Sequence, residues 1–137
     1  MARIVLTNAL VTVNAVDLSD YVASVTLNSS IDVVETTAFS STAARTRIGG
    51  LADNSISLEF HQDYASGEVE ATIYPLIGTV TTVTVKPVNT TTSASNPLYT
   101  ASALVSEWTP LNGAVGELAT ASVTWPVSGA ITKTTSA

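Results

Sequence analysis

Apolar and polar residues alternate along most of the chain, and the segment from Ser24 to Val33 shows this most clearly. Its apolar residues share one parity and its short polar residues share the other: Val25, Leu27, Ile31 and Val33 against Ser24, Thr26, Asn28, Ser30 and Asp32. This period of two predicts a strand with one buried face. A solvent-facing strand usually carries Lys or other charged residues. The almost uncharged second face therefore indicates contact with other protein.

Further strands are predicted where alternation or β-branched residues recur, at residues 4–13, 55–60, 79–86, 99–108 and 118–127. Residues 21–37 form one long segment, or two strands joined by a hairpin or bulge around Asn28-Ser29-Ser30. The dipeptide Asn112-Gly113 predicts a hairpin between the last two strands.

One helix is predicted after residue 65. Ser66-Gly67-Glu68 supplies an N-cap and an acidic first turn. Apolar residues then recur at helical spacing, at Val69, Ile73, Leu76 and Ile77. Pro75 lies inside this pattern and ends or kinks the helix. The predicted class is mainly β, an antiparallel β-sandwich or barrel with one flanking short α-helix.

The length of 137 residues predicts a single domain, 1–137, with three irregular segments. Residues 38–54 lack periodicity and predict an extended loop, which is long by the usual standard. Residues 87–97 are rich in Thr, Ser and Asn and predict a mobile surface loop. Residues 130–137 are predicted to form a flexible or docking C-terminal arm.

Charged residues make up 12% of the chain, about half of the ~25% that is usual in globular domains. Five cationic and eleven acidic residues leave a net charge of −6. This argues against a nucleic-acid binder, which needs clustered Lys and Arg, but suits a protein that nucleic acid passes without sticking. A small monomer with so few charged residues would have little protection against self-association. The chain is therefore either a secreted protein rich in hydroxyl groups or one whose surface other subunits cover.

Targeting and redox signals are absent from the sequence. The N-terminal residues do not resemble a signal peptide, and no apolar run approaches the length of a membrane span. There is no cysteine, so the chain can form neither a disulfide nor a thiolate metal site.

Candidates for chemistry are few. The single histidine, His61, could orient on Asp63, but no strained serine turn accompanies it, and a surface histidine is the favoured interpretation. Three acidic pairs lack the spacing of a calcium loop and are interpreted as caps, turns or solvated faces: Asp17/Asp20, Asp32/Glu35 and Glu68/Glu70. The sequence predicts no enzyme activity, no catalytic residue, no metal site and no cofactor.

Two pairs of residues leave alternatives open. Arg45 and Arg47 mark a solvated loop end, an inter-subunit salt bridge or, least favoured, a contact with nucleic acid. Trp108 and Trp125 are interpreted as packing in the core or on a sheet face. The alternative for the tryptophans is an aromatic platform for a ligand such as a carbohydrate.

Three segments resemble the major tail (tail tube) proteins of long-tailed bacteriophages. They are SVTLNSSIDVVETTAF at 24–39, GLADNSISLEF at 50–60 and LNGAVGELATASVTW at 111–125. The resemblance covers roughly residues 20–130 and rests on diffuse strand patterns rather than on a rigid signature. It implies a β-sandwich or barrel with a flanking helix. The insertion at residues 87–97 has no clear counterpart in the family.

The resemblance implies a structural virion protein that polymerises as stacked hexameric rings into a tube for DNA delivery. Its partners would be further copies of itself, a tape-measure protein, and tail-tip or terminator proteins. DNA would pass through the lumen without specific binding, and no membrane insertion is expected. The protein would be made in the host bacterial cytoplasm and located in the virion tail.

The resemblance also implies roles for named residues. The extended loop, with Phe39, Arg45, Arg47 and Ile48, would reach a neighbouring subunit or the adjacent ring. Ser24, Thr26, Asn28, Ser30 and Asp32 would form a lumen wall or a subunit seam, and the sequence does not choose between these. The alternatives are a capsid decoration or tail-terminator protein, which would form trimers or a single ring, and a secreted β-sandwich binding module, which would be monomeric.

Overall fold

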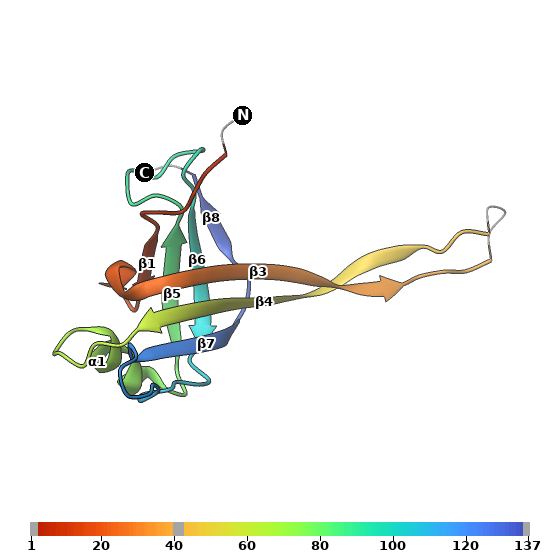
Figure 1. The fold of residues 1–137 in the computed structure, drawn as a ribbon. Coiled ribbons are helices and arrows are strands. Elements are labelled where there is room, and N and C mark those ends of the chain that lie inside the picture. Colours follow the sequence, from red (N-terminus) through yellow and green to blue (C-terminus); the bar gives the residue numbers. More distant parts are fainter. Residues whose placement is uncertain (1–2, 40–42, 136–137) are drawn as a thin grey trace.

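The computed structural model describes residues 3–39 and 43–135, and it is mainly antiparallel β with one short helix (Figure 1). The strands are β1 (Leu10–Val13), β2 (Val16–Asp17), β3 (Val22–Glu35), β4 (Arg47–His61), β5 (Val80–Lys86), β6 (Leu98–Leu104), β7 (Thr120–Val127) and β8 (Thr132–Thr134). The predicted class is therefore confirmed. The order of pairing is β2-β1-β5-β6-β7-β4-β3, with β8 on β6, and the sheet is not closed, so the barrel alternative was wrong.

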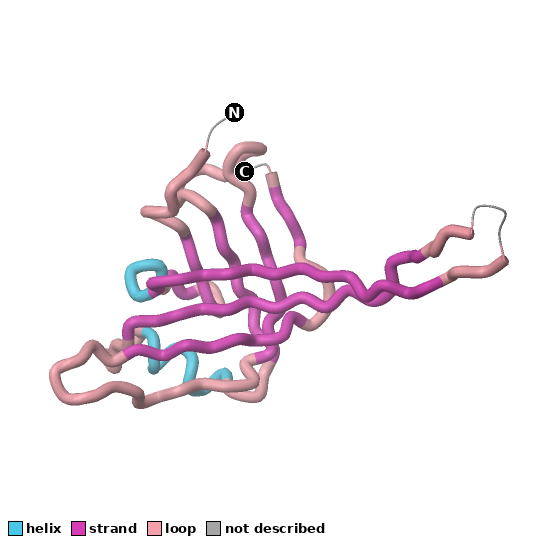
Figure 2. The backbone as a smooth tube through the Cα atoms, turned by 45° about the vertical axis from the view of Figure 1, so that its right-hand side comes forward, coloured by secondary structure: helices cyan, strands magenta, loops and turns pink. Residues whose placement is uncertain are grey.

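The sheet folds over on itself at the junction of β6 and β7, which share only the pair Ala103↔Val127. As a result β3, β4 and β7 cross the direction of β5, β6 and β8 (Figures 1 and 2). The inner faces of the two halves meet in one apolar core. Its largest fully buried side chains are Trp125, Phe60, Leu18, Ile56 and Ile73. The alternation that predicted these strands is thus the alternation of core and surface.

The helical segment lies where the apolar stripe placed it. Helix α1 spans Val69–Ile73 and continues as a 3₁₀ turn, η2, over Tyr74–Leu76. Val69 and Ile73 are fully buried against the core. The change to 3₁₀ geometry coincides with Pro75, whose ring cannot be accommodated in the interior of an α-helix. A second 3₁₀ turn, η1, spans Ser19–Tyr21 before β3.

The segment at residues 21–37 is a single strand rather than two. Strand β3 runs unbroken through Asn28-Ser29-Ser30, and its two irregularities fall elsewhere, where the register with β4 shifts between Val22 and Ser24 and between Ile31 and Val33. Strand β4 begins at Arg47, so the prediction of a loop over residues 38–54 was wrong for 47–54. Residues 40–42 of that predicted loop lie outside the described residues. Gly49-Gly50 removed the alternation that would have revealed the strand.

The hairpin of β3 and β4 extends beyond the rest of the sheet (Figure 1). Strand β7 leaves β4 at the pair Asn54↔Val127, and beyond this point only β3 and β4 pair with each other. We call this two-stranded part, the described residues 31–39 and 43–53, the arm. A Cβ atom on Gly50 would lie 2.9 Å from the Cγ2 atom of Val34. Glycine is thus the residue that lets the two strands of the arm approach so closely.

The predicted hairpin at Asn112-Gly113 was wrong. Strand β6 ends at Leu104, and residues 105–119 form a long connection that lies along β7. The Glu107 carboxylate accepts a hydrogen bond from the Thr124 amide at 2.8 Å, and the Glu107 carbonyl accepts one from the Trp125 indole at 2.9 Å. The Glu107 carboxylate thus takes the place of a hairpin partner at the Thr124 backbone amide.

The two remaining irregular segments are more regular than the sequence indicated. In the loop at 87–97, the Asn96 side chain is buried and bonds the backbone of Val88 through both its amide nitrogen and its oxygen. Residues 132–134 of the predicted C-terminal arm form β8, which pairs with β6 in register Tyr99↔Lys133. That part of the segment is therefore built into the sheet, and residues 136–137 lie outside the described residues.

Candidate assembly surfaces

Three strands present one flat polar surface on the outside of the sheet. Cross-strand pairing aligns its residues in three rows: Ser24–Glu59–Ser122, Thr26–Ser57–Thr124 and Asn28–Ser55–Pro126. We call these nine residues the polar face. Their neighbours along each strand, such as Leu58 and Val123, point into the core. The polar face is thus a direct consequence of period-2 alternation in three strands that pair in register.

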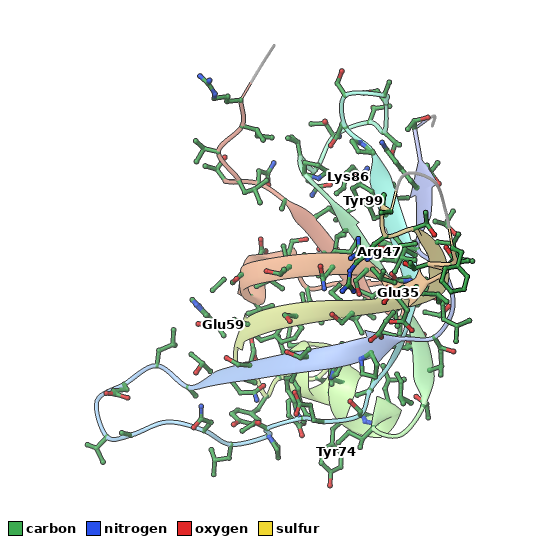
Figure 3. The ribbon with its side chains drawn as sticks, turned by 90° about the vertical axis from the view of Figure 1, so that its right-hand side faces the viewer. Glu35, Arg47, Glu59, Tyr74, Lys86 and Tyr99 are labelled. Atoms are coloured by element: carbon green, nitrogen blue, oxygen red, sulfur yellow. The ribbon has the colours of Figure 1, made fainter. Side chains whose placement is uncertain are left out.

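The chemistry of the polar face is short hydroxyl and amide groups with little charge. The hydroxyls of Ser57 and Thr124 lie 3.1 Å apart and share a hydrogen bond across the strands. Glu59 is its one ionised residue, and Figure 3 shows this side chain projecting away from the core. Glu107 borders the face beside Thr124. None of the five Lys and Arg residues of the chain belongs to the polar face, so its charge is negative.

The structure divides the five residues predicted for a lumen wall or subunit seam. Ser24, Thr26 and Asn28 lie on the polar face. Ser30 lies at the base of the arm, where its hydroxyl donates to the Asp53 carbonyl at 2.8 Å. Asp32 is in the arm, at the register shift. Sequence parity could not show this division, because β7 accompanies β3 and β4 over only part of their length.

The arm exposes large apolar side chains because no second layer from the described part of the chain lies over it. The Phe39 side chain is fully exposed. The next most exposed side chains are Leu51 at 80%, Val33 at 70% and Ile48 at 60%. A lone two-stranded hairpin is marginally stable in water, and contiguous exposed apolar surface usually marks an interface. The arm therefore has the properties of a segment that packs on another protein surface.

Arg45 and Arg47 lie on the same arm but have different surroundings. The Arg45 guanidinium lies 3.4 Å from the Glu35 carboxylate, and both side chains are exposed. The salt bridge that the described residues show is thus within one chain, and an exposed pair of this kind contributes little stability. Arg47 is the first residue of β4 and the register partner of Glu35, the last residue of β3 (Figure 3).

Strand β3 also presents a long free edge. Among the described residues it pairs only with β4, so one side of a strand of 14 residues has no partner strand. Beyond Asn54, the edge of β4 that faces away from β3 lacks one as well. Free edges of this length are templates for pairing with another chain, and monomeric proteins usually block them.

A second exposed apolar segment was missed by the sequence analysis. In the connection at 105–119, Leu111, Val115 and Leu118 are exposed, and the segment projects from the end of β7 (Figure 3). Its base is held by the Tyr64 hydroxyl, which donates to the Pro110 carbonyl at 2.6 Å. The three apolar residues at spacings of four and three are the available signal in the sequence, whereas Asn112-Gly113 predicts a tight turn there.

Several ionisable residues that were candidates for catalysis form hydrogen bonds to nearby groups in the fold. Asp17 accepts a hydrogen bond from the Ser19 amide at 2.9 Å, and Asp63 accepts one from the Ala65 amide at 2.9 Å. His61 is half-buried at the end of β4. Hydrogen bonds to the carboxylates of Glu68 and Asp63 raise the pKa of Tyr21 above its usual range, because ionisation would add a third negative charge there. Tyr21 thus links η1 to the turn before α1.

Within the part of the chain that the structure describes, no three His, Cys, Asp or Glu side chains are grouped so that they could hold a metal ion. The same residues contain no helix that is long and apolar enough to cross a membrane.

Comparison with known proteins gives matches in structure but not in sequence. No known family profile matches the chain, and no curated protein matches it in sequence. A chain from the virion of a native gene transfer agent superposes with a TM-score of 0.73 at 14% identity, covering 93% of this chain and 95% of that one. A chain from the sheath/tube terminator of an extracellular contractile injection system gives 0.72 at 15% identity and 97% coverage of both.

The chain therefore shares the fold of chains from a gene transfer agent virion and from a contractile injection system. A third match, from the sheath-tube complex of the same kind of injection system, has a TM-score of 0.69 at 14% identity over 97% of this chain and 92% of that one. At such identities the likeness concerns the fold alone. The resemblance to tail tube proteins that the sequence indicated is therefore confirmed at the level of the fold.

Proposed function

We propose that the protein is the building block of a phage-type tail tube, in which copies associate into hexameric rings that stack around a lumen. The observation that carries the proposal is the arm, an apolar two-stranded projection that no other described residue of its own chain covers. It combines with the long free edge of β3, whose pairing with another copy would remove an aggregation hazard. One of the matching structures is a gene transfer agent tail solved with C6 symmetry, which supports six copies in a ring.

In this proposal the polar face lines the lumen. A wall with carboxylates and no Lys or Arg repels phosphates, and hydroxyl groups offer few strong contacts that would retain DNA during passage. Before DNA enters, the same wall would surround a tape-measure protein. Tail-tip and terminator proteins would bind the ends of the tube. The protein would be made in the cytoplasm of the host bacterium and end in the virion tail, acting as a conduit without catalysis.

A terminator protein is the second candidate. Its support is that a chain from a sheath/tube terminator structure matches this fold as well as the virion chain does, with TM-scores of 0.72 and 0.73. A terminator forms one ring and stops there, whereas a tube protein continues to add rings. The two functions therefore differ in what the purified chain does on its own.

Purified protein at high concentration is expected to form tubes of uniform width. The apolar side chains of the arm each contribute about 1.5–3 kcal/mol when fully buried, and each copy contributes several. Negative-stain electron microscopy and sedimentation velocity over a concentration series would measure the assembly. Single rings without tubes would favour the terminator, and a monomer at all concentrations would refute both candidates.

The lumen assignment is tested by single cysteines, because the chain has none of its own. In assembled tubes, Thr26→Cys on the polar face is expected to react with a small maleimide and to react at least tenfold more slowly with a large PEG-maleimide. Ser102→Cys is the matched control, since Ser102 is exposed on β6 in the other half of the sheet. Gel shifts would quantify both reactions. Protection of Thr26→Cys from both reagents would place it in a subunit seam instead.

A further inference from the structure

An apolar groove of about 510 Å³ lies beside the free edge of β3. Strands β5, β6 and β8 continue past β3, and among the described residues no strand covers the inner face of the sheet there (Figure 1). The groove is lined by Val25 and Leu27 of β3, Val85 of β5 and Tyr99 of β6, and Ile131 precedes β8 at its margin. Val25, Leu27 and Tyr99 are only partly buried although they adjoin the core. The groove is thus an incomplete part of the core.

Two of the five cationic residues of the chain line this groove. Lys133 is the register partner of Tyr99, and Lys86 follows Val85 on the neighbouring strand (Figure 3). The Lys86 ammonium donates to the Thr90 carbonyl at 2.8 Å. In a protein of net charge −6, two lysines at the rim of an apolar groove favour an occupant that is apolar and carries carboxylates.

We propose that this groove receives the arm of a second copy of the chain. One face of the arm offers the exposed apolar side chains of Val34 and Ile48, which are register partners, together with the carboxylates of Asp32 and Asp53 toward its base. It projects away from the body of its own chain, so it does not reach its own groove (Figure 1). Apolar surface meets apolar surface, and the carboxylates meet Lys86 and Lys133. The free edge of β3 adds unpaired backbone groups along the same groove.

This contact has a defined geometry of association. Each copy has one arm and one groove on different parts of its surface, so the contact joins unlike patches. Contacts between unlike patches leave one arm and one groove free after every addition, and they end only when a ring closes. The inference rests on the proposed tube function and adds the receptor surface and the direction of assembly within a ring.

Two complementary variants test the contact. The arm variant, Val34→Asp with Ile48→Asp, keeps an intact groove but has an arm that cannot bind one. The groove variant, Ile131→Glu with Lys133→Glu, keeps an intact arm but has a groove that cannot bind one. Each alone is expected to stay monomeric at ten times the concentration at which the wild type assembles. An equimolar mixture is expected to form a one-to-one dimer and nothing larger, measured by sedimentation velocity.

Controls separate this inference from the proposed function. Arg3→Glu reverses a charge outside the groove and is expected to assemble as the wild type does, and circular dichroism checks the fold of every variant. Lys133→Glu alone, which leaves the apolar lining intact, is expected to raise the concentration needed for assembly about tenfold. Normal tubes from the groove variant would overturn the inference, and would assign the groove to a different protein or to DNA. Failure of the wild type to assemble would instead contradict the tube function.

Discussion

A chain whose arm is shortened by replacing residues 36–46 with Asn-Gly is expected to fold normally but to form no tubes. Glu35 and Arg47 are register partners at the ends of β3 and β4, so a two-residue type I′ turn can close the hairpin there. The shortened arm keeps Val34 and Ile48, the register partners whose side chains share the face that would enter the proposed groove. It loses Phe39, the fully exposed aromatic residue toward the tip. We therefore expect rings to form and their stacking to be lost.

Negative-stain microscopy and light scattering would measure the outcome of this change. A control chain with residues 36–46 replaced by a Gly-Ser segment of equal length keeps the reach of the arm but not its side chains. Failure of both chains to stack would assign the effect to the side chains, whereas stacking of the control alone would assign it to length. Tubes of normal length from the shortened chain would refute the role of the tip.

The size of the expected loss of stacking follows from the apolar surface that each contact buries and from the number of subunits in a ring. A buried Phe side chain contributes about 1.5–3 kcal/mol relative to an exposed one. If each of six subunits makes this contact between two rings, the loss per ring junction is on the order of 10 kcal/mol. A loss of that size changes an association constant by several orders of magnitude. The ladder of β3 and β4 within the body does not depend on the tip, so folding is retained.

The sequence predicted those parts of the fold that local pattern determines. Period-2 alternation placed Ile56, Leu58 and Phe60 inside and Ser57 and Glu59 outside, as the structure has them. The apolar stripe and Pro75 gave the short helix and its end. In each case a side chain must be buried or exposed once the strand or helix forms, and the chain itself carries that information.

The errors concern pairing over long distances and positions without side chains. Gly49 and Gly50 carry no alternation, so the start of β4 was read as loop, although pairing with β3 fixes the strand. Asn112-Gly113 favours a tight turn locally, but β6 turns away and β4 becomes the main partner of β7. Local propensity cannot report which strand a distant segment will meet.

The residues of the candidate assembly surfaces were located only in part by the sequence, for the same reason. The outer parity of β3 identified Ser24, Thr26 and Asn28, but not that residues of β4 and β7 would extend them into three rows. The groove at β3 was not predictable, because its lining comes from strands far apart in the sequence. Surfaces built by one strand can be read from alternation, whereas surfaces built between strands require the topology.

Trp125→Ala is expected to lower the free energy of unfolding by about 4 kcal/mol, which is typical of large-to-small changes at a buried tryptophan. The Trp125 side chain is fully buried, its ring centroid lies 6.5 Å from that of Phe60, and its indole donates to the Glu107 carbonyl at 2.9 Å. The change leaves a cavity at the centre of the core and an unpaired carbonyl. The total free energy of unfolding of a folded protein is typically about 5–15 kcal/mol, so this loss would remove a large share of it.

Trp108→Ala is the matched control, because the same residue type contacts the same phenylalanine from a shallower position. Its ring lies 5.7 Å from that of Phe60 in an edge-to-face arrangement, but the residue is only partly buried and its indole nitrogen has no hydrogen-bond partner among the described residues. We expect a loss of about 1–2 kcal/mol. Trp125→Phe should fall between the two, since it keeps an aromatic ring and loses the hydrogen bond.

Urea denaturation followed by circular dichroism, at concentrations below the onset of assembly, would give the three values. Equal losses for Trp125→Ala and Trp108→Ala would contradict the core position of Trp125. The comparison also decides the ligand-platform alternative for Trp125. A platform residue faces solvent and its removal leaves stability almost unchanged, whereas a side chain enclosed by both halves of the sheet cannot be removed without loosening the frame that positions the polar face and the arm.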